Sequence, residues 1–529
     1  MKWRRNILFI CIYIIVMSGC SWWDKKSQSG SPAPANPPQH ASNWLLQKPL
    51  AFTISLPTTK SGGYSSKVDL QHEKWLDKLY DHFGVRMHVQ VTEQDKLPLL
   101  FASGQIPDVV GVYGTPSTPA MSGSVEAGVF HPLSQLLKTH TPKLMELIPE
   151  AAWKAVSMNG EIFGVPSYLS NPSRRATYIR KDLLQQTGLS PPQTVEEFVA
   201  MLRAFKKLGV AAPYAMRENF KYADLVFGAY DVLPYKDQFT VIGDEVVPKF
   251  FKIEAMQQAL RTMKTMYDEG LIARDFATIT ASHFFKTINS GEAAMWSHNA
   301  ISLNTFATTI QQAVPDASVG IIPSPKGPKH TGGYLLYTPV LTSYYVNNKV
   351  EPERVIAILK FLEWQATSRE ASMFYTFGIE GETYSVDRDG SIDYYGAPVT
   401  LEEQDEEVWR SGTLWLITDS AINRDKIATM KYGQEIIHAM DHTLRKEGLG
   451  GIGFYPELPA FMKYPTLAPQ QDVGPSFIVD NMVQMIYGVR PIEEWPEVLE
   501  EYRDRGGDEI IAEATERYFN NDGVIELTR

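Results

Sequence analysis

The chain has 529 residues, which at about 150 residues per domain indicates several domains or two large lobes. Hydrophobic residues make up 44% and charged residues 21%, so the chain can bury a sizeable core and is not expected to be disordered. The formal net charge of −11 disfavours nucleic acid as a partner, because an acidic surface repels phosphates. Both cysteines, Cys11 and Cys20, lie near the N-terminus, which excludes a disulfide framework or thiolate metal site in the remainder.

The first 19 residues are predicted to be an export signal. Three basic residues precede an unbroken apolar run at 7–17, which is too short to span a bilayer of about 30 Å but suits a secretory signal. The run leads into Met17-Ser-Gly-Cys20, which resembles a bacterial lipobox, although Met17 stands where leucine is usual. The resemblance implies that residues 1–19 are removed and that Cys20 is lipidated. The alternative is an ordinary signal peptide with a stray cysteine.

Residues 20–49 are predicted to form a flexible tether behind the lipidated cysteine. They are rich in Ser, Pro, Gly, Ala and Gln, and such a stretch buries too little apolar surface to offset its chain entropy. Two acyl chains on Cys20 would anchor the protein stably at the extracytoplasmic face of the cell membrane. Without residues 1–19 the chain has 47 basic and 61 acidic residues, a net charge of −14, which strengthens the case against anionic partners.

The folded body begins with alternating strands and helices. Strands are predicted at 51–56, 85–91 and 109–112, with helices at 66–83 and 92–103 between them. Gly84 and Gly104 are placed to end the two helices, whereas Pro98 disfavours the middle of the second. This alternation predicts an α/β layer with a parallel sheet, whose ligand crevice lies at the carboxyl ends of the strands. Tyr113 follows the third strand at such an end.

Further helices are readable along the chain. Thr194 and Glu197 have the spacing of a capping box that begins a helix running to Leu208. Other helices are predicted at 254–267, 352–364, 496–502 and 508–519. No short internal repeat occurs, which argues against solenoids and propellers. The body is therefore predicted to be mixed α/β with a helical C-terminal third.

Two segments resemble a dinucleotide-binding motif and a calcium-binding loop but do not meet the requirements of either. Gly448–Gly453 has the spacing of a dinucleotide fingerprint, but no strand precedes it and no helix follows, so a flexible loop is predicted. Asp387–Pro398 has carboxylates at calcium-loop spacing, but its glycine is misplaced and a hairpin turn at Asp389-Gly390 explains it better. Zinc, phosphate-loop and nucleophile-elbow motifs are also missing from the sequence. We expect no cofactor, no metal site and no catalytic residue.

Several segments together carry a family resemblance. They are Ala102-Ser-Gly-Gln-Ile-Pro-Asp108, Asn159-Gly-Glu-Ile-Phe-Gly-Val-Pro166, Tyr178-Ile-Arg-Lys-Asp182, Asp268-Glu-Gly-Leu-Ile-Ala-Arg-Asp-Phe-Ala277, Gly291-Glu-Ala-Ala-Met295, Pro325-Lys-Gly327 and Gly378-Ile-Glu-Gly-Glu-Thr-Tyr384. Their order and spacing resemble the extracellular solute-binding proteins of bacterial ABC sugar importers, of the long LipO-like lipoprotein type. No single segment is diagnostic, but together they extend over nearly the whole chain after the tether.

The resemblance implies a two-lobe, periplasmic-binding-protein-like (type II) α/β fold with a hinge, an interlobe cleft and a helical C-terminal extension. It places an N-lobe at 50–170 plus 330–372 and a C-lobe at 171–329 plus 373–529. The chain would cross between them near Tyr168–Ala176, Pro323–Gly332 and Ala371–Gly378. Such proteins capture a ligand by domain closure, deliver it to a membrane permease and catalyse nothing.

A sugar site needs flat aromatic platforms and converging hydrogen-bonding groups. The aromatic candidates at lobe edges or hinge positions are Tyr64, Tyr113, Tyr168, Trp296 and Tyr384. We expect Trp296→Ala to weaken ligand binding by about 1–3 kcal/mol without unfolding the protein. The alternative is that Trp296 packs between a strand and a helix.

The polar candidates lie beside this tryptophan and at the first hinge. His298 and Asn299 follow Trp296, and Asn171, Arg174 and Arg175 stand at the hinge, with Lys60 as a weaker candidate. An arginine there could bind ring oxygens or, bidentately, a uronate carboxylate. The alternative for the arginines is a solvated hinge salt bridge.

Two other functions stay open at this point. A surface-anchored glycoside hydrolase would need two carboxylates about 5.5 Å or about 6.5 to 9.5 Å apart across a cleft. A lipoprotein that binds peptides or senses a signal is the other alternative. We expect a monomer that binds a carbohydrate, with an oligosaccharide favoured because the lobes exceed what a monosaccharide requires.

Overall fold

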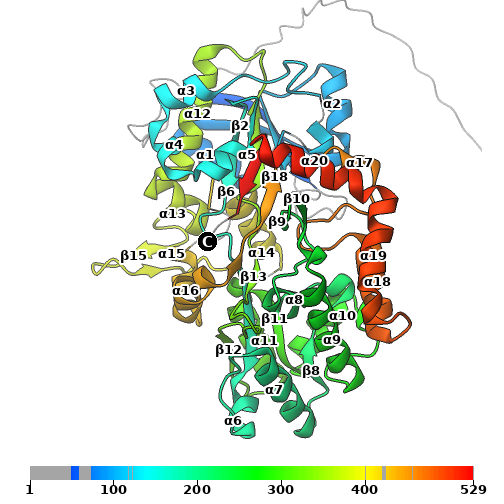
Figure 1. Cartoon of the computed structure of the whole chain (residues 1–529). Coiled ribbons are helices and arrows are strands. Elements are labelled where there is room, and N and C mark those ends of the chain that lie inside the picture. Colours follow the sequence, from blue (N-terminus) through cyan, green and yellow to red (C-terminus); the bar gives the residue numbers. More distant parts are fainter. Residues whose placement is uncertain are drawn as a thin grey trace, which may run out of the picture.

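The computed structural model describes residues 49–58, 73–116, 118–121, 123–398, 401–419, 424–455 and 457–527. The signal, the tether with Cys20, and the candidates Lys60 and Tyr64 lie outside these residues. Within the described ranges, no helix is both long enough and apolar enough to cross a membrane. Figure 1 shows two lobes, with the early strands in the upper one and the middle of the chain in the lower one.

The first lobe is built on a five-stranded sheet in the order β2-β1-β3-β14-β6. Its strands are β1 (Leu50–Thr58), β2 (Val85–Glu93), β3 (Val109–Tyr113), β6 (Gly164–Tyr168) and β14 (Val340–Val346). β1 pairs in parallel with β2 and β3, while β14 runs antiparallel to β3 and β6. The predicted parallel α/β layer is therefore confirmed for the first three strands.

Helices α1 (Lys74–Phe83) and α2 (Leu97–Ser103) connect these three strands. α1 begins where the Glu73 carboxylate accepts two backbone N–H groups at 2.9 Å, and it ends at Gly84 with φ +70°, as predicted. The second helix is shorter than expected, because β2 extends to Glu93 and α2 begins only at Leu97. Pro98 then falls in the first turn of α2, where its missing N–H removes no helical hydrogen bond.

The second lobe contains a four-stranded sheet in the order β12-β7-β11-β8. Its strands are β7 (Arg175–Arg180), β8 (Ala212–Ala215), β11 (Ala293–Asn299) and β12 (Val319–Ile322). β7 runs antiparallel to β11 and β12, and β11 runs parallel to β8. The carboxyl ends of β8, β11 and β12 therefore share one edge with the start of β7.

Helices pack in this lobe, and the two that were predicted, at 194–208 and 254–267, begin and end near the expected positions. The helices of this lobe include α7 (Val195–Lys207), α9 (Ile253–Asp268), α10 (Ala281–Asn289) and α11 (Leu303–Ala313). The capping box at the start of α7 is formed, with Thr194 accepting from the Glu197 N–H at 3.2 Å. The spacing of local polar residues was therefore sufficient to predict where this helix begins.

The C-terminal third adds helices and a second sheet to the same core. A sheet in the order β10-β9-β18-β19 combines β9 (Phe239–Ile242), β10 (Glu245–Pro248), β18 (Ile452–Phe454) and β19 (Val524–Glu526). Helices α18 (Ser476–Tyr487), α19 (Trp495–Tyr502) and α20 (Asp508–Phe519) line one side of the molecule (Figure 1). Buried residues from these helices join the core of the second lobe, while Ile525 and Leu527 reach the core of the first.

The glycine-rich segment Gly448–Gly453 is packed, so the predicted flexible loop is wrong. It forms β17 (Gly448–Leu449) and the start of β18, and β17 pairs with β13 (Tyr334–Leu335). A side chain at Gly451 would place its Cβ 2.4 Å from the Asp237 carbonyl oxygen. The glycines there permit close approach of two backbones rather than mobility.

Among the described residues, three segments that connect the lobes contact one another. The first lies between β6 and β7, and the second between β12 and β14. They lie side by side, because Leu169 N donates to Pro339 O at 3.0 Å and Tyr337 N donates to Pro172 O at 3.1 Å. The third segment joins them where Tyr168 N donates to Thr418 O at 3.3 Å.

The third segment does not lie at Ala371–Gly378 as expected. Helix α13 (Arg369–Phe377) packs into the core of the first lobe through Ala371, Phe374 and Tyr375. The chain enters a core of the second lobe only past Asp419, at α15 (Arg424–Ala428). An apolar stripe shows that a helix is covered, but it does not show which lobe covers it.

Candidate functional site

A pocket opens beside the first crossing segment, at the carboxyl end of β11. Its empty space amounts to about 310 Å³, part of it open to solvent. One wall is polar, with Asn171, Ser173, Arg174 and Asn299, and the other is apolar, with Ile301, Met440 and Leu444. The structure therefore brings together three of the predicted site residues, Asn171, Arg174 and Asn299.

Backbone contacts hold the polar wall in place. The Asn171 side-chain oxygen accepts from Ser173 N–H at 3.2 Å, a local turn that shapes the crossing segment. Ala300 N donates to Arg174 O at 3.0 Å, which ties this segment to the end of β11. The Tyr178 hydroxyl supports the same corner by donating to the Asn299 carbonyl at 2.7 Å.

Three polar groups of this wall lack a protein partner among the described residues. The Ser173 hydroxyl and the Asn299 side-chain oxygen are buried and have no hydrogen-bond partner among these residues. Ser173 is only 3% exposed, so little water reaches it. The Arg174 guanidinium forms no ion pair with any described residue. Its carbon lies 5.4 Å from the centroid of the Tyr337 ring. Burial lowers the pKa of Arg174, and the neighbouring charge of Arg175 acts in the same direction. Buried polar groups are normally satisfied, so this wall is suited to a polar ligand.

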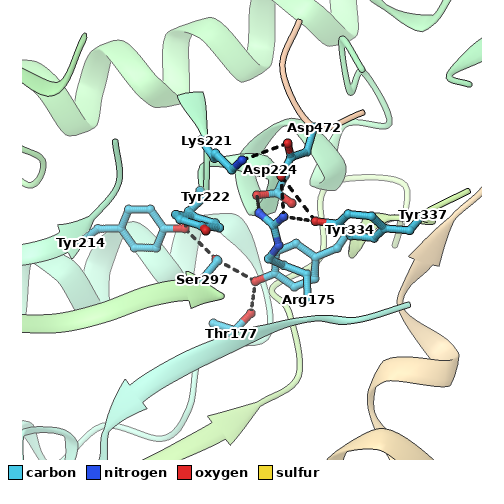
Figure 2. A network of polar contacts seen from close by, with 10 residues as sticks. All are labelled: Arg175, Thr177, Tyr214, Lys221, Tyr222, Asp224, Ser297, Tyr334, Tyr337 and Asp472. Atoms are coloured by element: carbon cyan, nitrogen blue, oxygen red, sulfur yellow. Dashed lines mark hydrogen bonds and ion pairs between the residues drawn. The ribbon is translucent and has the colours of Figure 1, made fainter. Parts of the chain in front are cut away.

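Arg175 next to it is committed to a buried ion-pair network (Figure 2). Its guanidinium is 2% exposed and pairs with Asp224 at 3.3 Å and with Asp472 at 3.0 Å. Lys221 binds the other Asp472 oxygen at 3.1 Å, and the Tyr337 hydroxyl also contacts Arg175. Of the two interpretations offered for the hinge arginines, the salt bridge describes Arg175, although the pair is buried and not solvated.

Burial and charge act in opposite directions on the two carboxyls of this network. Burial raises the pKa of Asp224, and the Arg175 charge offsets only part of that rise. Burial would also raise the pKa of Asp472, but the charges of Arg175 and Lys221 hold it below its ordinary value. The two acids are thus already neutralised by cations of the protein.

A chain of hydroxyl groups continues the network below Arg175 (Figure 2). Thr177 contacts the Tyr334 hydroxyl at 2.6 Å, and Ser297 lies 2.9 Å from Tyr334 and 2.9 Å from Tyr214. The Tyr214 hydroxyl ends the chain by donating to the Tyr222 carbonyl at 2.6 Å. These contacts join β7, β8, β11 and β13, so they rigidify the sheet edge that supports the pocket.

The loop after β8 carries a strained backbone. Asn219, Phe220 and Tyr222 have φ values of +59°, +56° and +70°, a region that bulky side chains rarely occupy. The Tyr222 ring lies 4.6 Å from the Arg175 guanidinium carbon and stacks on Phe284 at 4.8 Å. Such strain persists only where the surroundings fix it, and it clusters at functional sites.

Trp296 lies in the core of the second lobe and not at a surface. Its side chain is 0% exposed, stacked on Tyr178 with ring centroids 5.4 Å apart and packed edge-on against Phe306 at 5.5 Å. No ring face is left for a ligand in this structure, so the core-packing alternative describes its position. The strand reaches the pocket only three residues later, at Asn299.

His298 lies between these two positions. Its Nδ1 is 2.9 Å from the Ser302 hydroxyl, and its ring packs against Tyr222 at 4.9 Å and Phe306 at 5.3 Å. Burial lowers its pKa to about 3, and the charge of Arg175 contributes to the same shift. His298 is therefore neutral at physiological pH and adjoins the Arg175 network rather than lining the pocket.

The three tyrosine candidates that lie within the described residues do not line the pocket. Tyr113 is 38% exposed at the carboxyl end of β3, where Gln94 holds its backbone. Tyr168 is buried at the end of β6, and burial together with the Asp419 charge raises its pKa to about 12. Tyr384 is buried against Phe377 at 5.8 Å. Only Tyr113 presents a partly open ring.

The calcium-like segment forms a hairpin, as predicted. Strands β15 (Ser385–Val386) and β16 (Ile392–Asp393) pair antiparallel around a turn in which Gly390 has φ +86°. In the part of the chain that the structure describes, no group of three or more His, Cys, Asp or Glu side chains could hold a metal ion.

Sequence reasoning missed several members of the site. Ser173 was visible between two candidates, whereas Met440 and Leu444 come from α16 (Gly433–His442) and the turn after it, far along the chain. Their spacing of four residues indicates a common helix face, but nothing local indicates that this face meets residue 174.

Comparisons with known proteins show which family the chain resembles. The family model described as bacterial extracellular solute-binding protein matches residues 76–379. The chain is 30% identical over 315 residues to lipoprotein LipO of Bacillus subtilis (strain 168), an alignment covering 56% of this chain and 60% of LipO. It is 21% identical over 406 residues to the polygalacturonan/rhamnogalacturonan-binding protein YtcQ of the same organism, covering 73% of this chain and 75% of YtcQ.

Solved structures share the fold over most of the chain. The alginate-binding protein AlgQ2 superposes with a TM-score of 0.63 at 19% identity, covering 90% of this chain and 99% of AlgQ2. An EF-hand mutant of the ABC-transporter substrate-binding protein FusA of S. pneumoniae, in complex with fructo-nystose, gives 0.61 at 14% identity, covering 89% and 99%. At such identities the likeness shows the fold alone, and it confirms the predicted two-lobe α/β architecture.

Proposed function

Because the chain belongs to the family of bacterial extracellular solute-binding proteins, we propose that it captures an oligosaccharide between its lobes and delivers it to the permease of an ABC transporter. The proposal extends the family assignment to a ligand class and a partner. Names of relatives support the ligand class: YtcQ is named for polygalacturonan and rhamnogalacturonan, AlgQ2 for alginate, and FusA was solved with fructo-nystose.

The pocket beside the first crossing segment is the observation that carries this proposal. Its polar wall offers a hydroxyl, an amide oxygen and a guanidinium without protein partners among the described residues, from Ser173, Asn299 and Arg174. Its other wall offers the aliphatic side chains of Met440 and Leu444. A pyranose presents both hydroxyl groups and apolar C–H faces, so the two walls match its two kinds of surface.

The position of the pocket suits capture by closure. Three crossing segments lie side by side next to it, and a hinge of a few such residues can absorb the change in backbone angles when two lobes close. The pocket combines the first crossing segment with the end of β11 and with α16, so a bound ligand would contact the hinge directly.

The pocket also separates this proposal from the hydrolase alternative. The described residues that line it include no Asp or Glu, whereas a glycoside hydrolase needs a pair of carboxylates on either side of the scissile bond.

We propose in addition that Cys20 carries the lipid that holds the protein at the extracytoplasmic face of the membrane. Replacing Cys20 with alanine would then release the chain from the membrane fraction, and retention of the variant would contradict the anchor.

A ligand screen tests the binding proposal. The purified chain is heated with panels of oligosaccharides and peptides, because a ligand at a hundredfold its dissociation constant stabilises the protein by about 2.7 kcal/mol. X-ray scattering with the best ligand should show a more compact particle, and chromatography should recover that ligand uncleaved. Stabilisation by peptides and by no saccharide, or recovery of cleaved ligand, would refute the proposed function.

A further inference from the structure

Arg174 has no acidic partner among the described residues, in a chain that has 61 acidic and 50 basic residues. The nearby acids are committed elsewhere, since Asp224 pairs with Arg175, and Asp472 pairs with both Arg175 and Lys221. In the described part of the chain, the Arg174 side chain has only the face of the Tyr337 ring, 5.4 Å away, as a close neighbour for its charge. Within the part of the chain that the structure describes, the positive charge of the pocket wall is therefore unpaired.

Asp419 is the remaining acid whose charge reaches Arg174. Its carboxylate accepts the Ser170 N–H at 3.2 Å and also the Ser170 hydroxyl. No ion pair joins it to Arg174, and Asp419 does not line the pocket. The carboxylate is thus engaged by the crossing segment, and Arg174 lines the pocket without it.

The neighbours of Arg174 indicate what kind of anion would fit. Ser173 and Asn299 flank it with a hydroxyl group and a side-chain oxygen that are buried and unsatisfied among the described residues. An oxygen acceptor such as that of Asn299 attracts a hydroxyl donor and repels a second anionic group. The wall thus suits one carboxylate placed beside hydroxyl groups, which is the pattern of a uronic acid.

We infer that the ligand of this pocket is an acidic oligosaccharide, in which the carboxylate of a uronate unit pairs with Arg174 while Ser173 and Asn299 bind its hydroxyls. The inference rests on the proposed function and narrows its ligand class. A guanidinium presents a planar fork that matches a carboxylate with two parallel hydrogen bonds. A neutral hydroxyl would leave the charge of a partly desolvated guanidinium uncompensated, whereas a charge-assisted bond is about twice as strong as a neutral one.

Matched pairs of ligands test the inference by calorimetry on the intact protein. Each pair consists of an acidic trisaccharide and its neutral counterpart with the same linkage, such as galacturonate against galactose or glucuronate against glucose oligomers. The acidic member should bind at least about tenfold more tightly, which corresponds to about 1.4 kcal/mol, and its affinity should fall as salt is raised. Arg174→Gln should abolish the preference for the acidic member of each pair, and Arg174→Lys should retain part of that preference.

Arg274 provides a matched control, because it is an exposed arginine over a tyrosine ring, 4.7 Å from Tyr267, outside the pocket. Arg274→Gln should leave both affinities unchanged. Equal or tighter binding of the neutral sugars by the unmodified protein would overturn the inference and leave the proposed function intact. Failure of every saccharide to bind would instead overturn the proposed function. If Arg174→Gln did not fold, the matched pairs and their salt dependence in the unmodified protein would still decide.

Discussion

Replacing Trp296 with phenylalanine separates a core residue from a ligand platform. Trp495 is the matched control, because both side chains are 0% exposed and both lie in cores of the second lobe. They differ at the indole nitrogen. The Trp495 Nε1 donates to the Phe250 carbonyl at 3.0 Å, whereas the Trp296 Nε1 is buried without a hydrogen-bond partner among the described residues.

The expected difference follows from that nitrogen. Both substitutions remove a similar volume, so their packing losses are comparable. Trp296→Phe also removes an unsatisfied donor whose burial costs about 1–3 kcal/mol, while Trp495→Phe breaks a hydrogen bond and leaves the Phe250 oxygen without that donor. We therefore expect Trp495→Phe to destabilise the protein by about 2 kcal/mol more than Trp296→Phe. Trp296→Ala, by contrast, should cost about 3–5 kcal/mol.

Urea unfolding followed by far-ultraviolet circular dichroism measures both free energies of unfolding. Ligand affinity of folded Trp296→Phe, measured by calorimetry, should stay within about threefold of the unmodified protein, since less than 0.7 kcal/mol is expected from a residue without ligand contact. A Trp296→Phe variant as unstable as Trp495→Phe would refute the account of the nitrogen. Lost affinity at unchanged stability would restore Trp296 as a platform.

Three further predictions concern stability. The pKa of His298 is about 3 in the folded protein and about 6.5 in the unfolded chain. As the pH falls below 6.5, the unfolded chain binds a proton that the folded protein does not, so the protein loses stability. The loss should reach about 2 kcal/mol between pH 7.5 and pH 5, and His298→Asn should flatten this slope in urea titrations. Thr194→Ala should cost about 1 kcal/mol, and an unchanged unfolding midpoint would contradict the capping box. Gly333→Ala should destabilise the protein far more than Gly243→Ala. The new Cβ at residue 333 would lie 1.7 Å from the Glu447 carbonyl oxygen, whereas the space around Gly243 is open. Similar urea midpoints for the two variants would refute this clash.

Local signals were sufficient for many of the elements. Gly84 ends α1 in a left-handed conformation, and Thr194 with Glu197 begins α7, because capping involves groups only a few residues apart. The parallel arrangement of the first three strands also followed from the spacing of strands and helices.

Elements whose environment is set by distant residues were predicted less well. Gly448–Gly453 was expected to be flexible, but β13 and the Asp237 backbone pack against it. Helix α13 was expected to lead into the second lobe, but its apolar face contacts the core of the first. In both cases the residue types were compatible with either outcome, and the neighbours that decided between them are far away in the sequence.

The sequence by itself determined the alternation of the first strands and helices, the ends of several helices, and the likeness to solute-binding proteins, because these depend on residues close along the chain. Only the tertiary structure decided that Trp296 is enclosed while Asn299, three residues further along β11, reaches a pocket. It also decided that Arg175, and not Arg174, pairs with Asp224 and Asp472, which come from separate segments of the chain. Neighbouring residues in a chain acquire different roles when distant segments converge on one of them, and that convergence is encoded in no local pattern.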